Sequence, residues 1–287
     1  MSPLVSVVVP AYNNADYIDA TVQSVLAQTC TDLELVIADH SSTDGTWERL
    51  QQYADHPAVR LTRTSPGGGA QRNWNAVSQA AEGTYVKLVC GDDLVHLEAL
   101  ARQVDALERA GERCVLAAAQ RDMVDARGQV FLRARGLAGL DGVVDGAAAL
   151  RATVRAGGNI FGEPASVLMR RSALEAAGWW ADSQYFIDVA TYAGVLVQGD
   201  MVAIREPLAS FRVSQGQWSV RLVNDQARQA TEFFRTAQRL APTITDGDIR
   251  LGTARAVALS VQRRAVYTLL GRRMRPAESP TVGAGMG

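Results

Sequence analysis

The chain has 287 residues, of which 47% are hydrophobic and 21% are charged, and its net charge is −1. This composition is typical of a globular protein with a sizeable core, and it does not support general affinity for nucleic acid. The three cysteines, Cys30, Cys90 and Cys114, are odd in number and far apart, which argues against a disulfide scaffold or a structural zinc site. No apolar run reaches the roughly 18 residues of a membrane span. No signal peptide precedes the first predicted strand, so we expect a cytoplasmic protein.

The first 110 residues alternate between apolar runs of strand length and segments with helical periodicity. We predict strands at 4–9, 33–38, 58–63 and 84–90, and helices at about 15–28, 44–54, 70–81 and 96–110. Repeated units of one strand and one helix require right-handed crossovers, which produce a mostly parallel sheet. The predicted fold class is therefore α/β, with an open sheet flanked by helices.

The pattern is less regular after residue 110. We predict a strand, a turn and a strand across 112–135 and loops around a short helix across 136–163. A strand at 165–169, helices at 171–177 and about 187–197, and two short strands at 201–204 and 208–212 follow. From 218 to 268 the sequence predicts two helices separated by Pro242. The Pro-, Gly- and Ser-rich end is expected to be disordered. We therefore divide the chain into an α/β domain at 1–215 (halves 1–110 and 111–215), a helical segment at 216–275 and a tail at 276–287.

Polar residues follow the predicted strands of the first half at the point where each strand ends. Ligands of open α/β sheets bind beyond the carboxyl ends of the strands, so these residues are expected to meet at one rim. They are Pro10, Tyr12 and Asn13 after the first strand, Asp39 after the second, and Asp92 and Asp93 after the fourth.

Asp92 and Asp93 are adjacent carboxylates that would repel one another without a cation. Mg²⁺ and Mn²⁺ bind in proteins through one or two carboxylates together with substrate phosphate oxygens. The simpler alternative is that Asp93 caps the following helix and Asp92 is solvated.

Asp39 and Arg72 are the next candidates at this rim. The Asp39 carboxylate could accept a hydrogen bond from a nucleobase or a ribose, or it could be a turn residue. Arg72 follows three glycines at the start of a helix, where a guanidinium could bind phosphate. The glycine run itself, Gly67–Gly69, matches neither the dinucleotide-binding nor the P-loop spacing.

Taken in order, these residues resemble those of the family 2 glycosyltransferases, which have the GT-A nucleotide-diphospho-sugar fold. The resemblance covers about 1–110 and, more loosely, 160–220. It implies that Pro10, Tyr12, Asn13, Asp39 and Arg72 lie around the donor nucleoside, and that Asp92, supported by Asp93, holds Mn²⁺ or Mg²⁺ on the diphosphate. The first half would then bind the donor and the second half the acceptor.

The resemblance also implies a general base in the second half. Asp188, at the start of a predicted helix, occupies the place of the family's catalytic carboxylate. Inverting sugar transfer needs such a base to take the proton of the attacking hydroxyl. Glu163 is the second candidate for this role. Without the resemblance, Asp188 would be an ordinary helix-start residue.

The chain departs from the family pattern at two positions. Cys90 stands where the usual Asp-x-Asp motif has its first carboxylate, and we interpret it as a small buried side chain. Ser214 lies near a position where many relatives carry a histidine, so a third protein ligand for the metal is in doubt. Arg212, Gln217 and Trp218 could contact the donor phosphates or the acceptor, although a packed tryptophan and a solvated arginine are the simpler interpretations.

The sequence therefore predicts an inverting, metal-dependent glycosyltransferase. Its expected partners are a nucleotide-diphospho-sugar donor and a glycan, lipid-linked or small-molecule acceptor. A nucleotidyltransferase is disfavoured because no lysine-bearing Gly-rich signature lies near the first strand. A catalytically impaired GT-A domain that serves as a nucleotide-sugar binding or scaffold module is the remaining alternative.

Arginines accompany apolar residues near the end of the chain. Arg263, Arg264, Arg272, Arg273 and Arg275 lie among Val266, Leu269 and Leu270. This pattern fits a basic amphipathic surface that contacts the inner face of a membrane. It also fits a packed helix with solvated arginines, and the sequence does not predict an oligomeric state.

Overall fold

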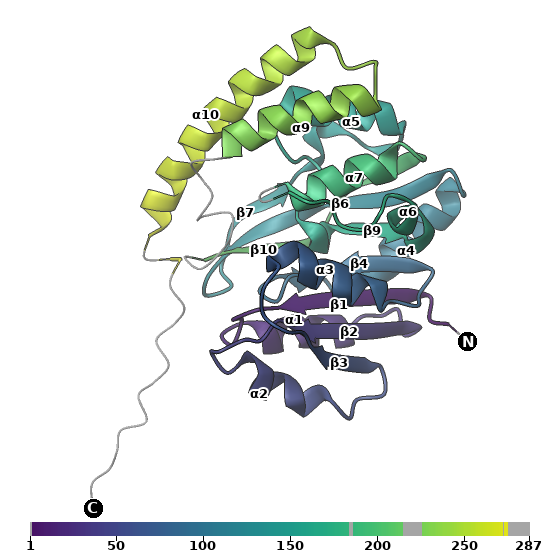
Figure 1. Cartoon of the computed structure of the whole chain (residues 1–287), viewed down its shortest axis with the longest axis vertical. Coiled ribbons are helices and arrows are strands. Elements are labelled where there is room, and N and C mark those ends of the chain that lie inside the picture. Colours follow the sequence, from purple (N-terminus) through teal and green to yellow (C-terminus); the bar gives the residue numbers. More distant parts are fainter. Residues whose placement is uncertain (1, 184–185, 215–225, 272, 275–287) are drawn as a thin grey trace, which may run out of the picture.

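The computed structural model describes residues 2–183, 186–214, 226–271 and 273–274. Within these residues one ten-stranded sheet crosses the molecule in the order β3-β2-β1-β4-β9-β6-β10-β5, with β7 paired to β6 and β8 to β10 (Figure 1). The strands are β1 (Val5–Ala11), β2 (Leu33–Asp39), β3 (Val59–Arg63), β4 (Tyr85–Leu88), β5 (Leu94–Val95), β6 (Cys114–Asp125), β7 (Val130–Arg135), β8 (Gly142–Val144), β9 (Val167–Arg170) and β10 (Asp200–Val213).

The first half of the sheet is parallel, as the sequence predicts. Strands β3, β2, β1 and β4 are neighbours in this order, and they pair with one another in parallel. All seven residues of β1 are buried, because helices cover both faces of the sheet. The register pairs Ala11 with Asp39, so the ends of β1 and β2 lie at the same edge.

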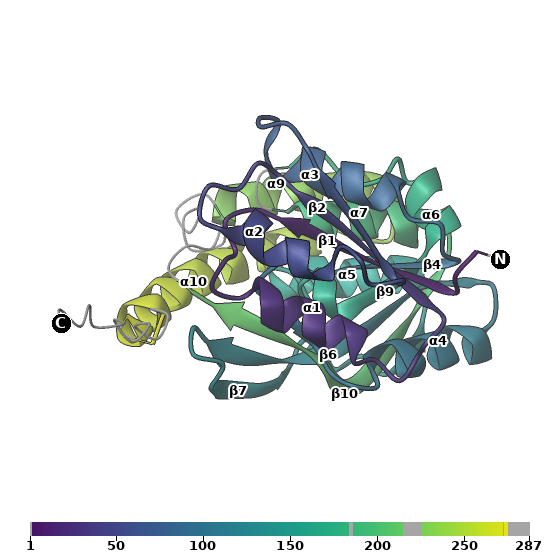
Figure 2. The ribbon, with the colours of Figure 1, turned by 90° about the horizontal axis from the view of Figure 1, so that it is seen from below.

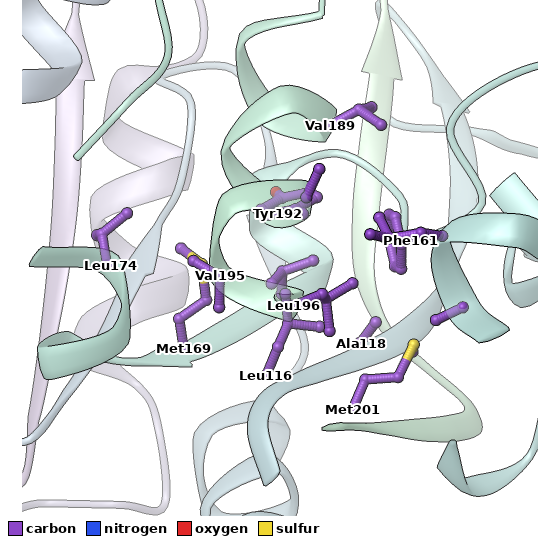
Figure 3. Close-up of a cluster of buried hydrophobic side chains, with 14 of the residues drawn as sticks. Leu116, Ala118, Phe161, Met169, Leu174, Val189, Tyr192, Val195, Leu196 and Met201 are labelled. Atoms are coloured by element: carbon purple, nitrogen blue, oxygen red, sulfur yellow. The ribbon is translucent and has the colours of Figure 1, made fainter. Parts of the chain in front are cut away.

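The helices form a layer on each side of the sheet (Figure 2). Helices α1 (Ile18–Leu26), α2 (Thr46–Leu50) and α4 (Ala99–Ala110) pack on one face, and α3 (Gly69–Gln79), α5 (Gly146–Ala156), α6 (Arg171–Ala176), α7 (Ile187–Leu196) and α9 (Gln226–Leu240) contribute to the core on the other. Figure 3 shows part of this second core, where Tyr192, Val195 and Leu196 of α7 lie over Leu116 and Met169 of the sheet.

The second half of the sheet is mixed. Strand β9 runs antiparallel to both β4 and β6. The two short strands predicted at 201–204 and 208–212 are wrong, because β10 is one continuous strand. Irregular pairing on either side of Pro207 absorbs the intervening residues, and proline, which has no N–H, is tolerated at such bulges.

Two helices follow the α/β domain, as the sequence predicts, and α10 (Asp246–Leu270) is the longer one. Asp248 at its start is buried and pairs with Arg151 (2.8 Å) and Arg155 (2.5 Å) of α5. Hydrogen bonds from Arg151 above all hold the pKa of Asp248 well below its usual value. Gly252 lies against the backbone of Val154, where a Cβ atom would meet the carbonyl oxygen at 2.1 Å.

Helix α9 shares the core of the sheet, because Phe233 and Phe234 are buried in the same cluster as Val8 and Leu116. None of the helices described combines the length and hydrophobicity needed to cross a bilayer. The predicted tail, 276–287, and the candidate contact residues Gln217 and Trp218 lie outside the described residues.

Lys87 is an unusual member of the core. It is the only lysine of the chain, and it is fully buried on β4. Its Nζ donates to Gln103 Oε1 (2.7 Å) and to the carbonyl oxygen of Val167 (3.3 Å). Burial lowers the pKa of Lys87 to about 7, because a low-dielectric interior disfavours the ammonium form.

We expect Lys87 to make the stability of the fold depend on pH. In the unfolded chain the amine keeps its proton up to about pH 10, whereas the folded chain has lost it above about pH 7. Protonation therefore favours unfolding, and the free energy of unfolding should rise by about 2 kcal/mol between pH 7 and pH 9 through this group alone. Denaturant melts of wild type and Lys87→Met at both pH values measure the difference. A pH dependence that is identical in the two proteins would contradict the expectation.

Candidate active site

The tips of β1 and β2 are joined by a network of hydrogen bonds between two loops. The backbone N–H of Asn13 donates to Ser42 Oγ (3.0 Å), and Asn13 Oδ1 accepts from the N–H of Thr43 (2.9 Å). Asn13 has a φ of 52°, a left-handed conformation that asparagine tolerates better than most residues. The predicted site residue Asn13 thus holds the shape of the rim.

Asp39 ends β2 beneath these loops, and its side chain is fully buried. Its Oδ2 accepts from the N–H of Ser42 (3.2 Å) and pairs with Arg63 Nε (3.1 Å). Its Oδ1 has no hydrogen-bond partner among the described residues. A buried carboxylate oxygen without a donor is costly, so this atom points to a ligand that brings an N–H or O–H group.

Tyr12 presents an aromatic ring beside Asp39. The side chain is 57% exposed, and its ring meets the edge of the His40 ring at a centroid distance of 6.1 Å. A positioned, exposed aromatic ring is suited to stacking on a base. Pro10, also predicted at this site, is buried within β1 and pairs with Ala38.

Arg72 lies near the start of α3, as the sequence predicts, and a second arginine, Arg63, contacts Asp39. Arg72, near the start of α3, is exposed and donates to Ser65 Oγ (2.9 Å) and the carbonyl oxygen of Gly67 (3.2 Å). Arg63, which the sequence did not single out, pairs with Asp39 and lies 5.1 Å from the Trp47 ring. Arg63 is therefore the cation in contact with the strand-tip carboxylate.

Asp92 and Asp93 follow β4 and occupy unequal environments. Asp92 is half-buried, whereas Asp93 is buried. Arg212 at the end of β10 holds both, since its N–H donates to Asp93 Oδ1 (3.0 Å) and its Nε donates to the Asp92 carbonyl oxygen (2.9 Å). The following helix begins at Ala99, so neither aspartate caps it. Arg212 is only 5% exposed, and its interpretation as a solvated arginine was wrong.

Acidic side chains from three parts of the chain surround Cys90. Burial, followed by the charges of Asp93, Asp92, Asp188 and Glu163, raises the pKa of the Cys90 thiol well above its usual value. The thiol is therefore protonated at neutral pH, and these four carboxyl groups share one electrostatic environment. The structure thus brings the predicted base Asp188 to the strand-tip aspartates.

Asp188 lies in the first turn of α7 and is held by two donors. Asn159 Nδ2 donates to Oδ2 (2.8 Å), and the N–H of Val189 donates to Oδ1 (2.8 Å). Asn159 is itself held, because its Oδ1 accepts from the N–H groups of Phe161 (2.9 Å) and Gly162 (3.1 Å). Burial raises the pKa of Asp188 to about 7, which suits a group that takes up a proton near neutral pH.

Glu163 is paired with a buried cation. Arg121 on β6 forms an ion pair with Glu163, with Nη2 3.2 Å from Oε1, and its Nη1 donates to the carbonyl oxygen of Arg135 (3.1 Å). The guanidinium occupies the carboxylate, which makes Glu163 less available than Asp188 to accept a proton. Arg121 also partly offsets the negative charge around Asp188.

The carboxylates of Asp92 and Asp93 have the chemistry to bind a divalent cation together with the phosphate oxygens of a bound diphosphate. No cluster of three or more His, Cys, Asp or Glu side chains within the described ranges is arranged to hold a metal by itself. Mg²⁺ typically takes one or two carboxylates and completes its shell with phosphate and water oxygens. Asp92 has the more exposed carboxylate, whereas Asp93 already accepts an N–H bond from Arg212.

Four polar residues of the site were missed or misread in the sequence: Arg63, Arg121, Asn159 and Arg212. Each contacts a carboxylate that is distant in sequence, up to 119 residues away for Arg212 and Asp93. A weak signal existed, because an isolated arginine inside an apolar strand, as at Arg121, needs a buried partner.

Comparison with known families gives one clear match. The model of glycosyl transferase family 2 matches residues 6–177. The undecaprenol-diphosphate-linked GlcNAc β-1,3-glucosyltransferase WfaP of Escherichia coli, a UDP-Glc-dependent enzyme by its description, is 33% identical over 105 residues, which are 37% of this chain and 41% of WfaP. Matched regions span only 10% to 41% of the first curated relatives, among them a Pasteurella multocida chondroitin synthase and WfaP.

Solved structures share the fold over most of the chain. TarS of S. aureus (residues 1–349) in complex with UDP-GlcNAc superposes with a TM-score of 0.69 and 17% identity, and covers 93% of this chain and 75% of that one. A Pyrobaculum calidifontis mannosyltransferase in complex with GDP-Man and Mn²⁺ gives 0.61 and 20%, with coverage of 93% and 81%. The predicted GT-A-type fold is confirmed by these likenesses.

Proposed function

The chain belongs to glycosyl transferase family 2, and from this premise we propose that it transfers a sugar from a uridine or thymidine diphosphate donor to an acceptor hydroxyl with inversion. The observation that carries the proposal is the position of Asp188, which Asn159 holds in the same acidic environment as Asp92 and Asp93. A base on the acceptor side and a cation-binding carboxylate on the donor side are the two parts that inverting transfer needs.

The nucleobase of the proposed donor follows from Asp39 Oδ1, which has no hydrogen-bond partner among the described residues. Uracil and thymine present a single imide N–H flanked by carbonyl oxygens, which a single carboxylate oxygen can accept. Guanine presents two adjacent donors that suit both oxygens of a carboxylate, but Asp39 Oδ2 already accepts from Ser42 and pairs with Arg63. Cytosine has an acceptor at the equivalent ring nitrogen. Tyr12 would stack on the pyrimidine ring.

The acceptor hydroxyl would lose its proton to Asp188 as it attacks the anomeric carbon. The raised pKa of Asp188, about 7, makes the carboxylate a stronger base than an ordinary aspartate. The two donors on its oxygens fix its direction, so that the hydroxyl meets it in one orientation. Asp188 is preferred to Glu163 because Arg121 occupies the latter.

Asp92, with Asp93 behind it, would hold Mn²⁺ or Mg²⁺ against the donor diphosphate. A cation there neutralises the charge that develops on the leaving nucleoside diphosphate. Arg212 keeps the turn that carries both aspartates in place through its bonds to each of them.

A catalytically impaired binding module is the alternative, and donor hydrolysis separates it from the proposal. UDP-, dTDP- and GDP-sugars are incubated with the full chain and Mn²⁺ or Mg²⁺, and released nucleotide is measured. The proposal expects slow release from uridine or thymidine donors. Binding of nucleotide without any release, with or without candidate acceptors, would instead support the binding module.

We expect Asp39→Asn to weaken the binding of UDP by roughly 10- to 100-fold, since hydrogen bonds to a charged group contribute about 1.5–3 kcal/mol. Wild type should bind UDP or dTDP at least about tenfold more tightly than GDP or CDP. Calorimetric titration with each diphosphate measures both effects. The melting temperature of each protein shows whether loss of the ion pair with Arg63 destabilises the fold. Equal affinity of the variant and wild type for UDP would refute the role of Asp39.

A further inference from the structure

The last helix carries a charge distribution unlike the rest of the chain. Residues 249–275 contain seven arginines and no lysine, aspartate or glutamate. The whole chain has a net charge of −1, so the remainder carries an excess of acidic groups. The positive charge concentrated in this segment favours contact with an anionic partner there, which would orient the molecule on such a partner.

An apolar row faces outward along the same helix. Val257 (50% exposed), Val261 (60%), Ala265 and Leu269 (86%) are spaced four residues apart and are all exposed. The inward face is made by small residues, with Gly252, Ala256 and Ser260 buried. Helix α10 therefore leaves Val257, Val261 and Leu269 exposed, whereas its other large apolar side chains are half-buried. An ordinary packed surface helix turns such side chains toward the core.

Arginines flank this outer face, which we define as Val257, Val261, Ala265 and Leu269. The helical repeat places Arg255 on one side of the row and Arg264 on the other. Both residues are exposed, and Arg255 Nη1 donates to the carbonyl oxygen of Arg155 (2.8 Å). Long basic side chains beside an apolar row can reach lipid phosphates while the row enters the boundary between headgroups and acyl chains.

The helix is fixed to the domain at both ends. Asp248 binds it to Arg151 and Arg155 at its start. Beyond its end, the carbonyl oxygen of Arg273 accepts from the N–H of Ala126. Arg212, which holds the strand-tip aspartates, donates to the carbonyl oxygen of the neighbouring Asp125 (3.2 Å). In Figure 1, α10 runs along the outer edge of the molecule.

We propose that the outer face of α10 docks on an anionic lipid bilayer and places the strand-tip site at the membrane surface. The excess of arginines over acidic residues in 249–275 makes this segment complementary in charge to anionic lipid. The alternative is that a second copy of the chain packs against the outer face. If the proposed transferase function also holds, its acceptor hydroxyl belongs to a membrane-bound molecule, and only this last step depends on that function.

Co-sedimentation of the full chain with phosphatidylcholine vesicles, with and without phosphatidylglycerol, tests the proposal. We expect binding only to the vesicles that contain phosphatidylglycerol, and release by salt. Val261→Glu combined with Leu269→Glu should reduce partitioning by at least about tenfold, and Arg264→Gln by about fivefold, since each basic residue near such a surface contributes about a factor of five. Leu97→Glu and Arg109→Gln, which change exposed residues away from α10, are the matched controls and should bind as wild type does.

Three results would overturn the proposal. Wild type could fail to bind anionic vesicles, or the double glutamate variant could bind as well as wild type. Sedimentation velocity could also show a wild-type dimer that the double variant converts to a monomer, which would assign the face to a second copy. Donor hydrolysis in solution is measured in parallel. Its absence from wild type argues against the transferase function and leaves the vesicle result unaffected.

Discussion

Asp188→Asn should retain donor binding and lose sugar transfer by about 10²–10⁴-fold, the usual contribution of a positioned general base. Asparagine can accept the hydrogen bond from the N–H of Val189, but its NH2 group would then face the Asn159 donor. The melting temperature of the variant is therefore recorded with the rates. The amide cannot take a proton from an acceptor hydroxyl. Initial rates of transfer and titration with UDP, measured on both proteins, separate loss of chemistry from loss of binding.

Asp182→Asn is the matched control, since Asp182 is an exposed aspartate six residues earlier. It should transfer sugar at the wild-type rate. Transfer by Asp188→Asn within a factor of about three of wild type would remove Asp188 from the base role. Glu163→Gln would then be the variant to examine.

The wild-type enzyme should lose kcat/KM as the pH falls below about 7. The carboxyl group of Asp188 has its pKa raised to about 7 by burial, and its protonated form cannot act as a base. The acid limb of the pH–rate profile therefore belongs to Asp188 and should be absent from the residual activity of Asp188→Asn. An acid limb near pH 4 in wild type would contradict this assignment.

Asp92→Asn should lose the stabilisation that Mn²⁺ adds to UDP binding, and about 10²–10³-fold of transfer, similar to the loss of one electrostatic contact to developing charge. Asp92 has the more exposed of the two strand-tip carboxylates, and the amide is a weaker ligand for a hard cation. The melting temperature with UDP, recorded with and without Mn²⁺, reports metal-linked binding independently of activity. Wild type should show a larger shift with Mn²⁺, and the variant should show the same shift in both conditions.

Asp55→Asn, at an exposed aspartate remote from the strand tips, is the control for this variant. Equal donor hydrolysis by wild type and Asp92→Asn would refute the metal assignment. A Mn²⁺-dependent shift that persists in Asp92→Asn but disappears in Asp93→Asn would move the assignment to the neighbouring residue.

Local patterns were sufficient to predict the donor half of the fold. Continuous apolar runs specify buried parallel strands, and the residue that ends each run stands at the strand tip. Asp39 and Asp92 were identified in this way, and their strands were found as predicted. The second half was less predictable, as the single strand β10 shows, because a strand interrupted by bulges carries no simple period.

The partners of the predicted carboxylates were not predictable from such patterns. Arg63, Arg121, Asn159 and Arg212 belong to other elements of the fold. The sequence contains 28 arginines, and nothing local distinguishes the three arginines of this set from the rest. The roles of Arg121 and Arg212 follow from burial, because a cation enclosed by the fold must meet an anion or a carbonyl oxygen. Arg63 is exposed, and its role follows from its pairing with the buried Asp39. Arg72, chosen from its place at a helix start, instead lies exposed against its own loop.

The sequence by itself determined the α/β class, the order of the strand-tip residues and the resemblance to family 2 glycosyltransferases, because apolar periodicity and residue order are local properties of a chain. Only the tertiary structure decided which oxygen of Asp39 stays open, that Asn159 holds Asp188, and that a row of apolar side chains on α10 stays exposed. Those features depend on which side chains the packed strands and helices bring within a few ångströms of one another, and on which they exclude from water.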